Sequence, residues 1–425
     1  MSYDASRDRR SVRLQEAAAG YRCLFSKPVQ SMKFAAMEMK NKVKILVLAE
    51  EAPVQTDQGD RIRFLHFLRE LSHHHELTLI HFGDNTGEIE KTFSVPRPSL
   101  AGKLLRAFFA LDLPVTVAMR RTGRMRRVLA ELAKNGDYDL VFIYQTKMAA
   151  YFSILSGPVV VDLTDAVSLY YRRMARFCRL PLRLLYRFEQ LKMARFERRL
   201  LESGVTCLVA SEADAGYLRG IAPEARLAVV PNGVDTAYFA PTKANNSSFD
   251  LVFVGNMAYP PNRDGVLFFY RQVFPAVLKS CPEARLVVVG KNAQDDILAL
   301  RKDRAVIVTG YVDDVRPYLR EAAVVICPVR FGAGTRIKIL EAMAMGRAVV
   351  STAVGCEGLG VVAGEAIMIA NEPGEMAEAI VDLLEDREKS RRIGLQAAET
   401  VKRMYDFTVI GQQLEKLFVA ELCQK

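Results

Sequence analysis

The sequence of 425 residues predicts an α/β protein made of two doubly wound domains, each with a parallel sheet. Two series of short runs rich in valine, isoleucine and leucine alternate with helical patterns, as in sheets that carry helices on both faces. A turn signal at Asn232-Gly233 and a polar stretch at 241–248 separate the two series. Ligands of such sheets bind at the carboxyl ends of the strands, so we expect site residues in the loops that follow strands.

The first series begins with an apolar run at 43–49, followed by a loop at 50–59 and an amphipathic helix at 60–72. Further strands of this series are expected at 77–82, 140–144, 159–163, 207–210 and 227–230. The second series predicts strands at 251–254, 286–289, 306–308, 324–327 and 349–352.

Composition is typical of a soluble globular enzyme, because half of the residues are hydrophobic and a quarter are charged. We find no apolar run long enough to cross a membrane. The seven cysteines are scattered without paired spacing, which favours a reducing cytosol over a disulfide framework. Residues 1–41 lack the apolar block of a signal peptide and are expected to be a disordered extension, with Met32, Met37 or Met39 as alternative starts.

Residues 328–346 predict a binding site for a nucleoside diphosphate. A strand leads into a loop with two glycines, and a helix with two basic residues and a glutamate follows. Glycines let a ligand approach the backbone, free N–H groups at a helix start attract phosphate, and the carboxylate can accept hydrogen bonds from ribose. The alternative is an ordinary helix with solvated basic side chains. The candidate residues are Gly332, Gly334, Thr335, Arg336, Lys338 and Glu341.

This stretch resembles the donor site of GT-B glycosyltransferases, in particular family 4 and its bacterial exopolysaccharide branch, which reads roughly P-x-R-x-G-x-G-T-R-x-K-x-L-E-A-M-A-x-G. Many members carry two glutamates separated by seven residues. Here Glu341 is the second, and Ala333 stands at the first position. The V-P-N-G-V-D string at 230–235 is similar to the interdomain connection of the family. The resemblance covers about residues 43–420.

The resemblance implies two Rossmann-like domains that face a central cleft. Residues 42–235 would form the acceptor-side domain and residues 236–405 the domain that binds the nucleotide sugar. Residues 406–425 would form a helix that crosses back to the first domain.

The same resemblance assigns further donor contacts. Gly59 would let the first-domain backbone close over the donor phosphates, and Arg61 or Arg63 would face the cleft. In the second domain the loops after successive strands would contact the nucleotide sugar, with the backbone around Gly310 and Val312 reading the base. Arg263 would reach the diphosphate, although a solvated helix start explains it equally well. The candidates in these loops are Gly255, Asn256, Arg263, Lys291, Gly310 and Val312.

For catalysis, Arg336 and Lys338 would stabilise the negative charge of the leaving diphosphate. The strand at 159–163 leads to Asp162 and Asp165, which we expect to face the acceptor, and Asp165 is the candidate that polarises its hydroxyl. A helix N-cap is the competing role of Asp165. Gln145 stands where another branch of the fold has a histidine, so histidine catalysis is not expected.

We expect no metal. The consecutive histidines at 73–75 cannot converge on one ion and are expected to be solvated. Asp137-Tyr-Asp139 has the spacing of a metal-binding motif from a different fold, but it follows Asn135-Gly136 and indicates a turn.

The net charge of +10 is concentrated in two ranges, 100–127 and 168–201, where basic and apolar residues interleave on predicted helices. This mixture favours an anionic membrane surface. Two other interpretations of these basic residues are a nucleic-acid surface, for which no recognition motif is present, and an ordinary helix face that contacts only solvent.

The sequence therefore predicts a metal-independent glycosyltransferase of the hexosyltransferase type, without a cofactor, that uses a UDP- or GDP-sugar as donor. The resemblance to family 4 implies that it retains the anomeric configuration. Its acceptor would be a saccharide or a polyprenyl-diphosphate-linked saccharide in exopolysaccharide or cell-surface glycan synthesis. The protein would be cytoplasmic and peripheral at the inner face of the plasma membrane. A sugar-nucleotide epimerase on the same fold, or a non-catalytic nucleotide-sugar-binding scaffold suggested by Ala333, are the alternatives.

Overall fold

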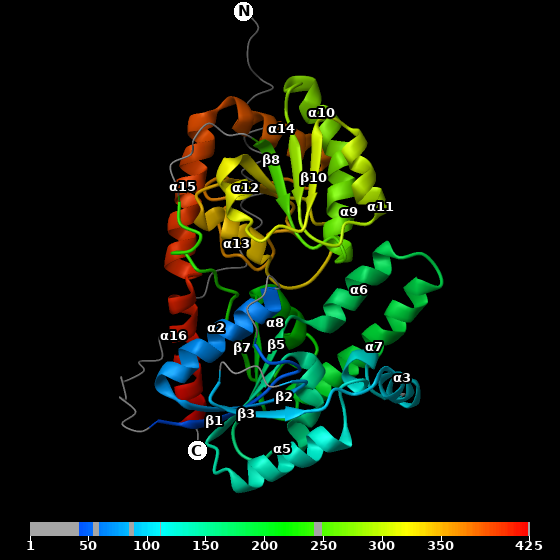
Figure 1. The fold of residues 1–425 in the computed structure, drawn as a ribbon, viewed down its shortest axis with the longest axis vertical. Helices are drawn as coiled ribbons and strands as arrows, with labels where there is room; N and C mark the ends of the chain where they lie inside the picture. Colours follow the sequence, from blue (N-terminus) through cyan, green and yellow to red (C-terminus); the bar gives the residue numbers. More distant parts are fainter. Residues whose placement is uncertain (1–41, 54–58, 85–88, 111, 242–248, 424–425) are drawn as a thin grey trace, which may run out of the picture. The chain divides into compact units, whose positions relative to one another are not determined.

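The computed structural model describes residues 42–53, 59–84, 89–110, 112–241 and 249–423. The expected N-terminal extension at 1–41 lies outside them. Within these ranges the chain forms two sheets in which every strand pair is parallel, and Figure 1 shows the strands and helices of both. This confirms the predicted α/β class with two doubly wound, Rossmann-like sheets.

The first sheet has seven strands in the order β3-β2-β1-β4-β5-β6-β7. Their bounds are β1 Lys44–Leu48, β2 Glu76–Phe82, β3 Lys91–Val95, β4 Leu140–Tyr144, β5 Val159–Thr164, β6 Thr206–Val209 and β7 Leu227–Val229. Apart from β3, every strand lies where an apolar run predicted it. The sequence analysis missed β3 because it is a half-exposed edge strand without an apolar run.

The helices of this half are α2 Gly59–His74, α3 Leu100–Phe109, α4 Val115–Ala118, α5 Gly123–Asn135, η1 Thr146–Ile154, α6 Val167–Phe177, α7 Leu182–Leu201 and α8 Glu212–Arg219. Most of them contribute to one apolar core with the central strands. The last helix, α16 Phe407–Leu422, also packs on the first sheet: Phe418 contacts Phe142 with 5.3 Å between ring centroids, and Glu421 accepts a 2.7 Å hydrogen bond from Thr206.

The second sheet has six strands in the order β10-β9-β8-β11-β12-β13. The strands are β8 Phe249–Val254, β9 Leu286–Val289, β10 Val306–Gly310, β11 Ala322–Cys327, β12 Ala348–Ser351 and β13 Met368–Ile369. The short β13 was not predicted, because two residues carry no periodicity.

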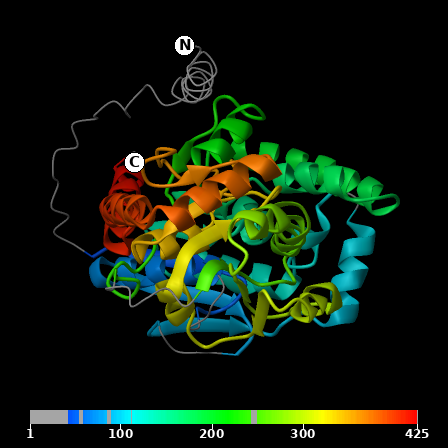
Figure 2. The same ribbon diagram turned by 90° about the horizontal axis from the view of Figure 1, so that it is seen from above.

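Two separate apolar cores show that helices cover both faces of this sheet. Figure 2 shows the ribbon of these helices from above. The helices are α9 Pro260–Phe268, η2 Phe269–Val273, α10 Phe274–Ser280, α11 Asp295–Leu298, η3 Ala299–Lys302, α12 Arg316–Glu321, α13 Ile337–Ala344, α14 Pro373–Glu385 and α15 Arg387–Met404. In the part of the chain that the structure describes, no helix is long and apolar enough to cross a membrane.

Candidate donor and acceptor site

The loop between β11 and α13 brings the predicted anion-binding residues together. Gly332 and Gly334 have positive φ values of 140° and 73°, which glycine adopts without strain. Arg336 is 7% exposed and folds back on this loop, where it donates to the carbonyl oxygens of Ala333 and Gly334. Thr335 is held by Asn232 of the interdomain connection, whose Nδ2 donates to Thr335 Oγ1 at 2.7 Å.

Arg336 retains unused hydrogen-bonding capacity. Its Nε and Nη2 atoms are buried and have no partner among the described residues. A buried guanidinium without an anion is costly, so these two donors indicate a position for a negatively charged ligand. A β-carbon on Gly332 would lie 2.3 Å from Nη2, which explains why glycine is needed at this position.

Lys338 and Glu341 lie one turn apart on α13 and are both affected by burial. Lys338 Nζ donates to Asn262 Oδ1 at 2.7 Å, and burial lowers the pKa of Lys338 to about 8. Burial also raises the pKa of Glu341 to about 7, although the charge of Lys338 opposes this. Neither charge is well compensated inside the protein, which is typical of groups that bind a ligand.

Because Gly255 has no side chain, the Lys338 ammonium can lie close to the backbone at the end of β8. A β-carbon at Gly255 would lie 2.7 Å from Lys338 Nζ, and one at Gly290 would lie 1.9 Å from Gly255 O. The backbones that end β8 and β9 are therefore packed directly against each other. Asn256 is held in this corner, because its Oδ1 accepts from Ala258 N and from Asn292 Nδ2 at 3.0 Å each.

The other predicted donor contacts are less clearly arranged around this loop. Lys291 is half-buried after β9, and Gly310 ends β10 with a φ of 78°. Val312 is half-buried against the core on one face of the second sheet. Arg263 pairs with Asp296 at 2.8 Å, so its contact with a diphosphate stays a prediction.

In the first half of the chain, Gly59 is the first residue of α2, and of the two alternative arginines only Arg63 is excluded from a donor contact. Arg61 forms an ion pair with Glu51. Arg63 does not face a cleft: it is 1% exposed and pairs with Asp162 at 2.9 Å. Asp162 is fully buried, so the expectation that it faces the acceptor is wrong. Residue spacing could not show that these two charges neutralise each other across 99 positions.

Asp165, which follows β5 of the first sheet, reaches the loop 328–336 between β11 and α13, called the donor loop from here on. A β-carbon on Gly334 would lie 1.9 Å from Asp165 Oδ1, so the carboxylate touches the loop backbone that Arg336 also contacts. Burial raises the pKa of Asp165, and the nearby Asp214 raises it further, while Arg336 opposes both. The alternative role as a helix N-cap is not observed, because Ala166 is the N-cap of α6.

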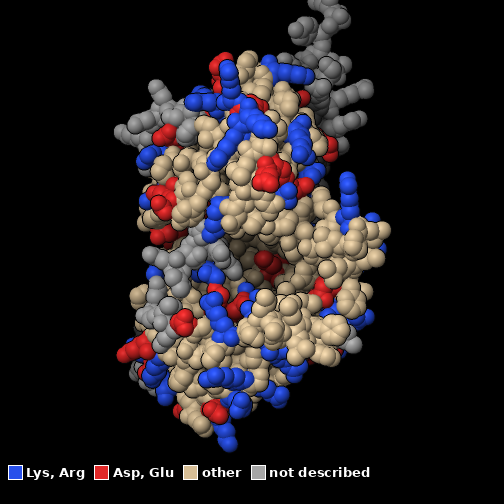
Figure 3. All heavy atoms as spheres, turned by 45° about the vertical axis from the view of Figure 1, so that its right-hand side comes forward, with Lys and Arg blue, Asp and Glu red and all other residues tan. Residues whose placement is uncertain are grey.

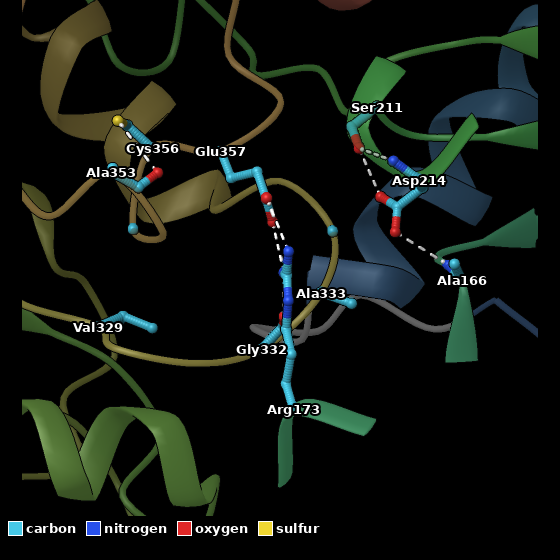
Figure 4. A network of polar contacts seen from close by, with 12 residues as sticks. Ala166, Arg173, Ser211, Asp214, Val329, Gly332, Ala333, Ala353, Cys356 and Glu357 are labelled. Carbon is cyan, nitrogen blue, oxygen red and sulfur yellow. Dashed lines mark hydrogen bonds and ion pairs between the residues drawn. The ribbon is translucent and has the colours of Figure 1, made fainter. Parts of the chain in front are cut away.

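Asp214 and Ser211 fix the start of α6, and sequence reasoning missed both. Asp214 Oδ1 accepts a 3.1 Å hydrogen bond from Ala166 N, and Asp214 Oδ2 accepts from Ser211 Oγ at 2.5 Å (Figure 4). Thr164, next to Asp165, has a φ of 64°, an uncommon value for a threonine. Backbone strain of this kind is concentrated at functional sites, which agrees with a role for this loop.

The C-terminal half of α6 contacts the donor loop. Arg173 donates to both carboxylate oxygens of Glu357, at 2.5 and 2.8 Å, and to Gly332 O at 2.6 Å (Figure 4). One helical turn further on, Phe177 packs on Phe331 with 4.2 Å between ring centroids. The sequence analysis placed Arg173 in a basic surface for a membrane, and this is wrong, because the side chain links the two halves of the chain.

The histidine stretch also needs a correction. His75 is 5% exposed rather than solvated, and its Nε2 lies 2.9 Å from Glu415 of α16. No group of three histidine, cysteine, aspartate or glutamate side chains in the described ranges is arranged to hold a metal.

Residues 248–386 match the family described as "Glycosyl transferases group 1". An uncharacterized 44.6 kDa protein in the cps region of Klebsiella pneumoniae is 23% identical over 384 residues, which cover 85% of this chain and 96% of that protein. A phosphatidyl-myo-inositol mannosyltransferase of Mycolicibacterium smegmatis is 27% identical over 199 residues, 44% of this chain and 50% of its own length.

Among solved structures, HepE of Anabaena in complex with UDP is similar, with a TM-score of 0.65 and 16% identity. The superposition covers 89% of this chain and 100% of that one. At this identity the likeness concerns the fold.

Proposed function

We propose that this chain, whose residues 248–386 match the glycosyl transferases group 1 family, moves a sugar from a nucleotide-diphosphate sugar to a saccharide or lipid-linked acceptor, with retention of configuration. The observation that carries the proposal is the buried Arg336, whose Nε and Nη2 lack partners beside the glycine loop. A nucleotide diphosphate would supply the missing acceptors and a negative charge.

The donor contacts follow from this placement. Arg336 and Lys338 bind the diphosphate and stabilise its charge as the sugar leaves. Glu341 binds the ribose hydroxyls, and the loops that contain Gly255, Asn256, Lys291 and Gly310 contact the remaining parts of the donor. The UDP complex of HepE supports a uridine nucleotide, and the mannosyltransferase relative supports a hexose. No metal takes part in this proposal, because basic side chains supply the positive charge.

Asp165 is the group that polarises the acceptor hydroxyl. Its contact with Gly334 from the other half of the chain supports this role, because donor and acceptor would have to meet near this loop. Its raised pKa favours a group that accepts a proton near neutral pH. The similarity to a protein of a cps region supports an acceptor in exopolysaccharide or cell-surface glycan synthesis.

We also propose that the protein works at an anionic membrane as a cytoplasmic, peripheral enzyme. Large apolar side chains of α3 and of the α6–α7 hairpin are exposed, among them Leu100, Phe108, Phe109 and Leu180, each at 69–76%. Lys192 Nζ of α7 donates to Ala110 O at the end of α3 at 3.2 Å, so the two regions are neighbours. Figure 3 turns this side forward and shows uncharged areas bordered by basic side chains. Exposed large apolar side chains on neighbouring helices, with basic side chains among them, support a binding surface.

A thermal-shift panel of UDP-, GDP- and dTDP-sugars tests the donor proposal directly. We expect one nucleotide class to raise Tm, and Arg336→Gln to abolish the rise without unfolding the protein. Transfer is then measured with the stabilising donor and a membrane extract as acceptor. Stabilisation without any transfer would instead favour a binding scaffold, for which Ala333 is the supporting observation.

A further inference from the structure

A group of basic side chains surrounds Glu50, the second residue after β1. Glu50 Oε1 accepts a 2.8 Å hydrogen bond from Arg120 Nε, and Glu50 Oε2 lies 2.5 Å from Lys147 Nζ, just beyond β4. Burial would raise the pKa of Glu50, but Lys147 and Arg120 together lower it below its usual value. A single carboxylate is thus shared between two cations at the carboxyl edge of the first sheet.

Two more arginines belong to this group through Tyr151. The Tyr151 hydroxyl donates to the backbone oxygen of Arg120 at 2.6 Å. Burial raises the pKa of Tyr151, and the nearby positive charges of Arg106 and Arg121 oppose this rise. Arg106 Nε and Nη2 are buried and have no hydrogen-bond partner among the described residues. We call Arg106, Arg120, Arg121 and Lys147 the basic cluster.

One member of the basic cluster, Arg106, lies on a helix whose large apolar side chains are exposed. Arg106 is half-buried on α3, whereas Leu104, Leu105 and Phe108 on that helix are 56%, 60% and 76% exposed. Positive charge beside exposed apolar side chains suits a ligand with an anionic head and an apolar chain. Unused guanidinium donors suit phosphate oxygens better than a saccharide.

The position in the sheet relates the cluster to the proposed chemistry. Glu50, Lys147 and Asp165 follow β1, β4 and β5, which are adjacent parallel strands, so all three lie at the same edge of the sheet. An acceptor anchored at the cluster could therefore extend its sugar toward Asp165.

We propose that the basic cluster binds the phosphate of a lipid-diphosphate-linked acceptor, while the exposed face of α3 contacts its apolar chain and Glu50 occupies the anion position in the free protein. This inference rests on the proposed function and deepens it, because it assigns the site that recognises the acceptor. The predicted consequence is that affinity depends on phosphate and apolar chain together.

Farnesyl diphosphate is a suitable probe, measured by calorimetry on the full chain with farnesol and inorganic pyrophosphate as comparisons. We expect farnesyl diphosphate to bind more tightly than either. Arg106→Gln and Lys147→Gln should each weaken its binding by about 10-fold or more, the effect of losing one charge-assisted hydrogen bond. The matched control Arg403→Gln, an exposed arginine in the last turn of α15, should leave it unchanged.

Glu50→Gln gives the sharpest outcome, because it should strengthen binding by removing the competing carboxylate. Weaker binding in this variant would mean that the cluster only holds the fold together, and the proposal would be wrong. Lys338→Ala should weaken UDP binding and spare farnesyl diphosphate. An equal loss of both would place the probe in the donor site and overturn the proposal. If wild-type protein binds farnesyl diphosphate but no nucleotide, the proposed function fails while the phosphate site stands.

Discussion

The contact of Arg173 with the donor loop should hold that loop in the conformation that binds the nucleotide sugar. Arg173 makes three hydrogen bonds, two of them to the Glu357 carboxylate, and both side chains are about a quarter exposed, at 21% and 26%. The energetic cost of breaking this partly exposed pair should lie between two limits. A surface ion pair is worth at most about 1 kcal/mol, and disrupting a buried one costs roughly 3–5 kcal/mol. We therefore expect Arg173→Gln to cost about 2 kcal/mol, or about 30-fold in kcat/KM for the donor.

A double-mutant cycle with Glu357→Gln tests this reasoning. Because both variants break the same contact, the double variant should be little worse than either single one, with a coupling energy of about 1–2 kcal/mol. Lysine at position 173 should not restore kcat/KM, because an ammonium cannot replace the bidentate guanidinium. Unfolding in denaturant provides the control for global stability. Additive losses in the cycle, or a loss of kcat/KM matched by general unfolding, would refute a role for this pair in positioning the loop.

Four further outcomes are expected. Lys338→Ala should weaken nucleotide binding by roughly 1.5–3 kcal/mol, and wild-type affinity measured by calorimetry should fall as pH rises through about 8, where the ammonium loses its proton. Glu341→Gln should weaken binding of a nucleotide but not of pyrophosphate; equal losses would make Glu341 structural. Burial raises the pKa of Glu197 from 4.5 to about 7, so the native state prefers the protonated acid. The contribution of Glu197 to the free energy of unfolding is present below pH 4.5 and is lost as the pH rises through 7. In denaturant titrations, Glu197→Gln should therefore raise the free energy of unfolding by up to about 3 kcal/mol at pH 8 and change it little at pH 4. A variant with four arginines of the α6–α7 hairpin replaced by Gln should bind acidic vesicles more weakly, by at most about 1 kcal/mol per charge, and high salt should also release the wild-type protein from vesicles. The four positions are Arg176, Arg179, Arg183 and Arg187. Unchanged co-sedimentation of this variant with vesicles would contradict membrane docking.

The fold was largely predictable because parallel strands buried on both faces require continuous apolar runs, and such runs are visible in the sequence. The two missed strands, β3 and β13, are an exposed edge strand and a two-residue strand, which lack that requirement. The donor loop was also predictable, since positive φ at Gly332 and Gly334 and the basic residues that follow are local properties. Its contribution to catalysis stays a prediction.

Pairing between distant charges was decided only by the tertiary structure. Arg63 and Arg173 are both arginines in helical patterns, and nothing in their neighbours in sequence distinguishes them from solvated residues. The fold buries Arg63 against Asp162 and joins Arg173 to Glu357, 184 positions away. The basic cluster around Glu50 likewise draws its members from separate elements. Charge type and local backbone preference are written in the sequence, but the partner of a charge depends on which strands and helices the packed chain brings side by side.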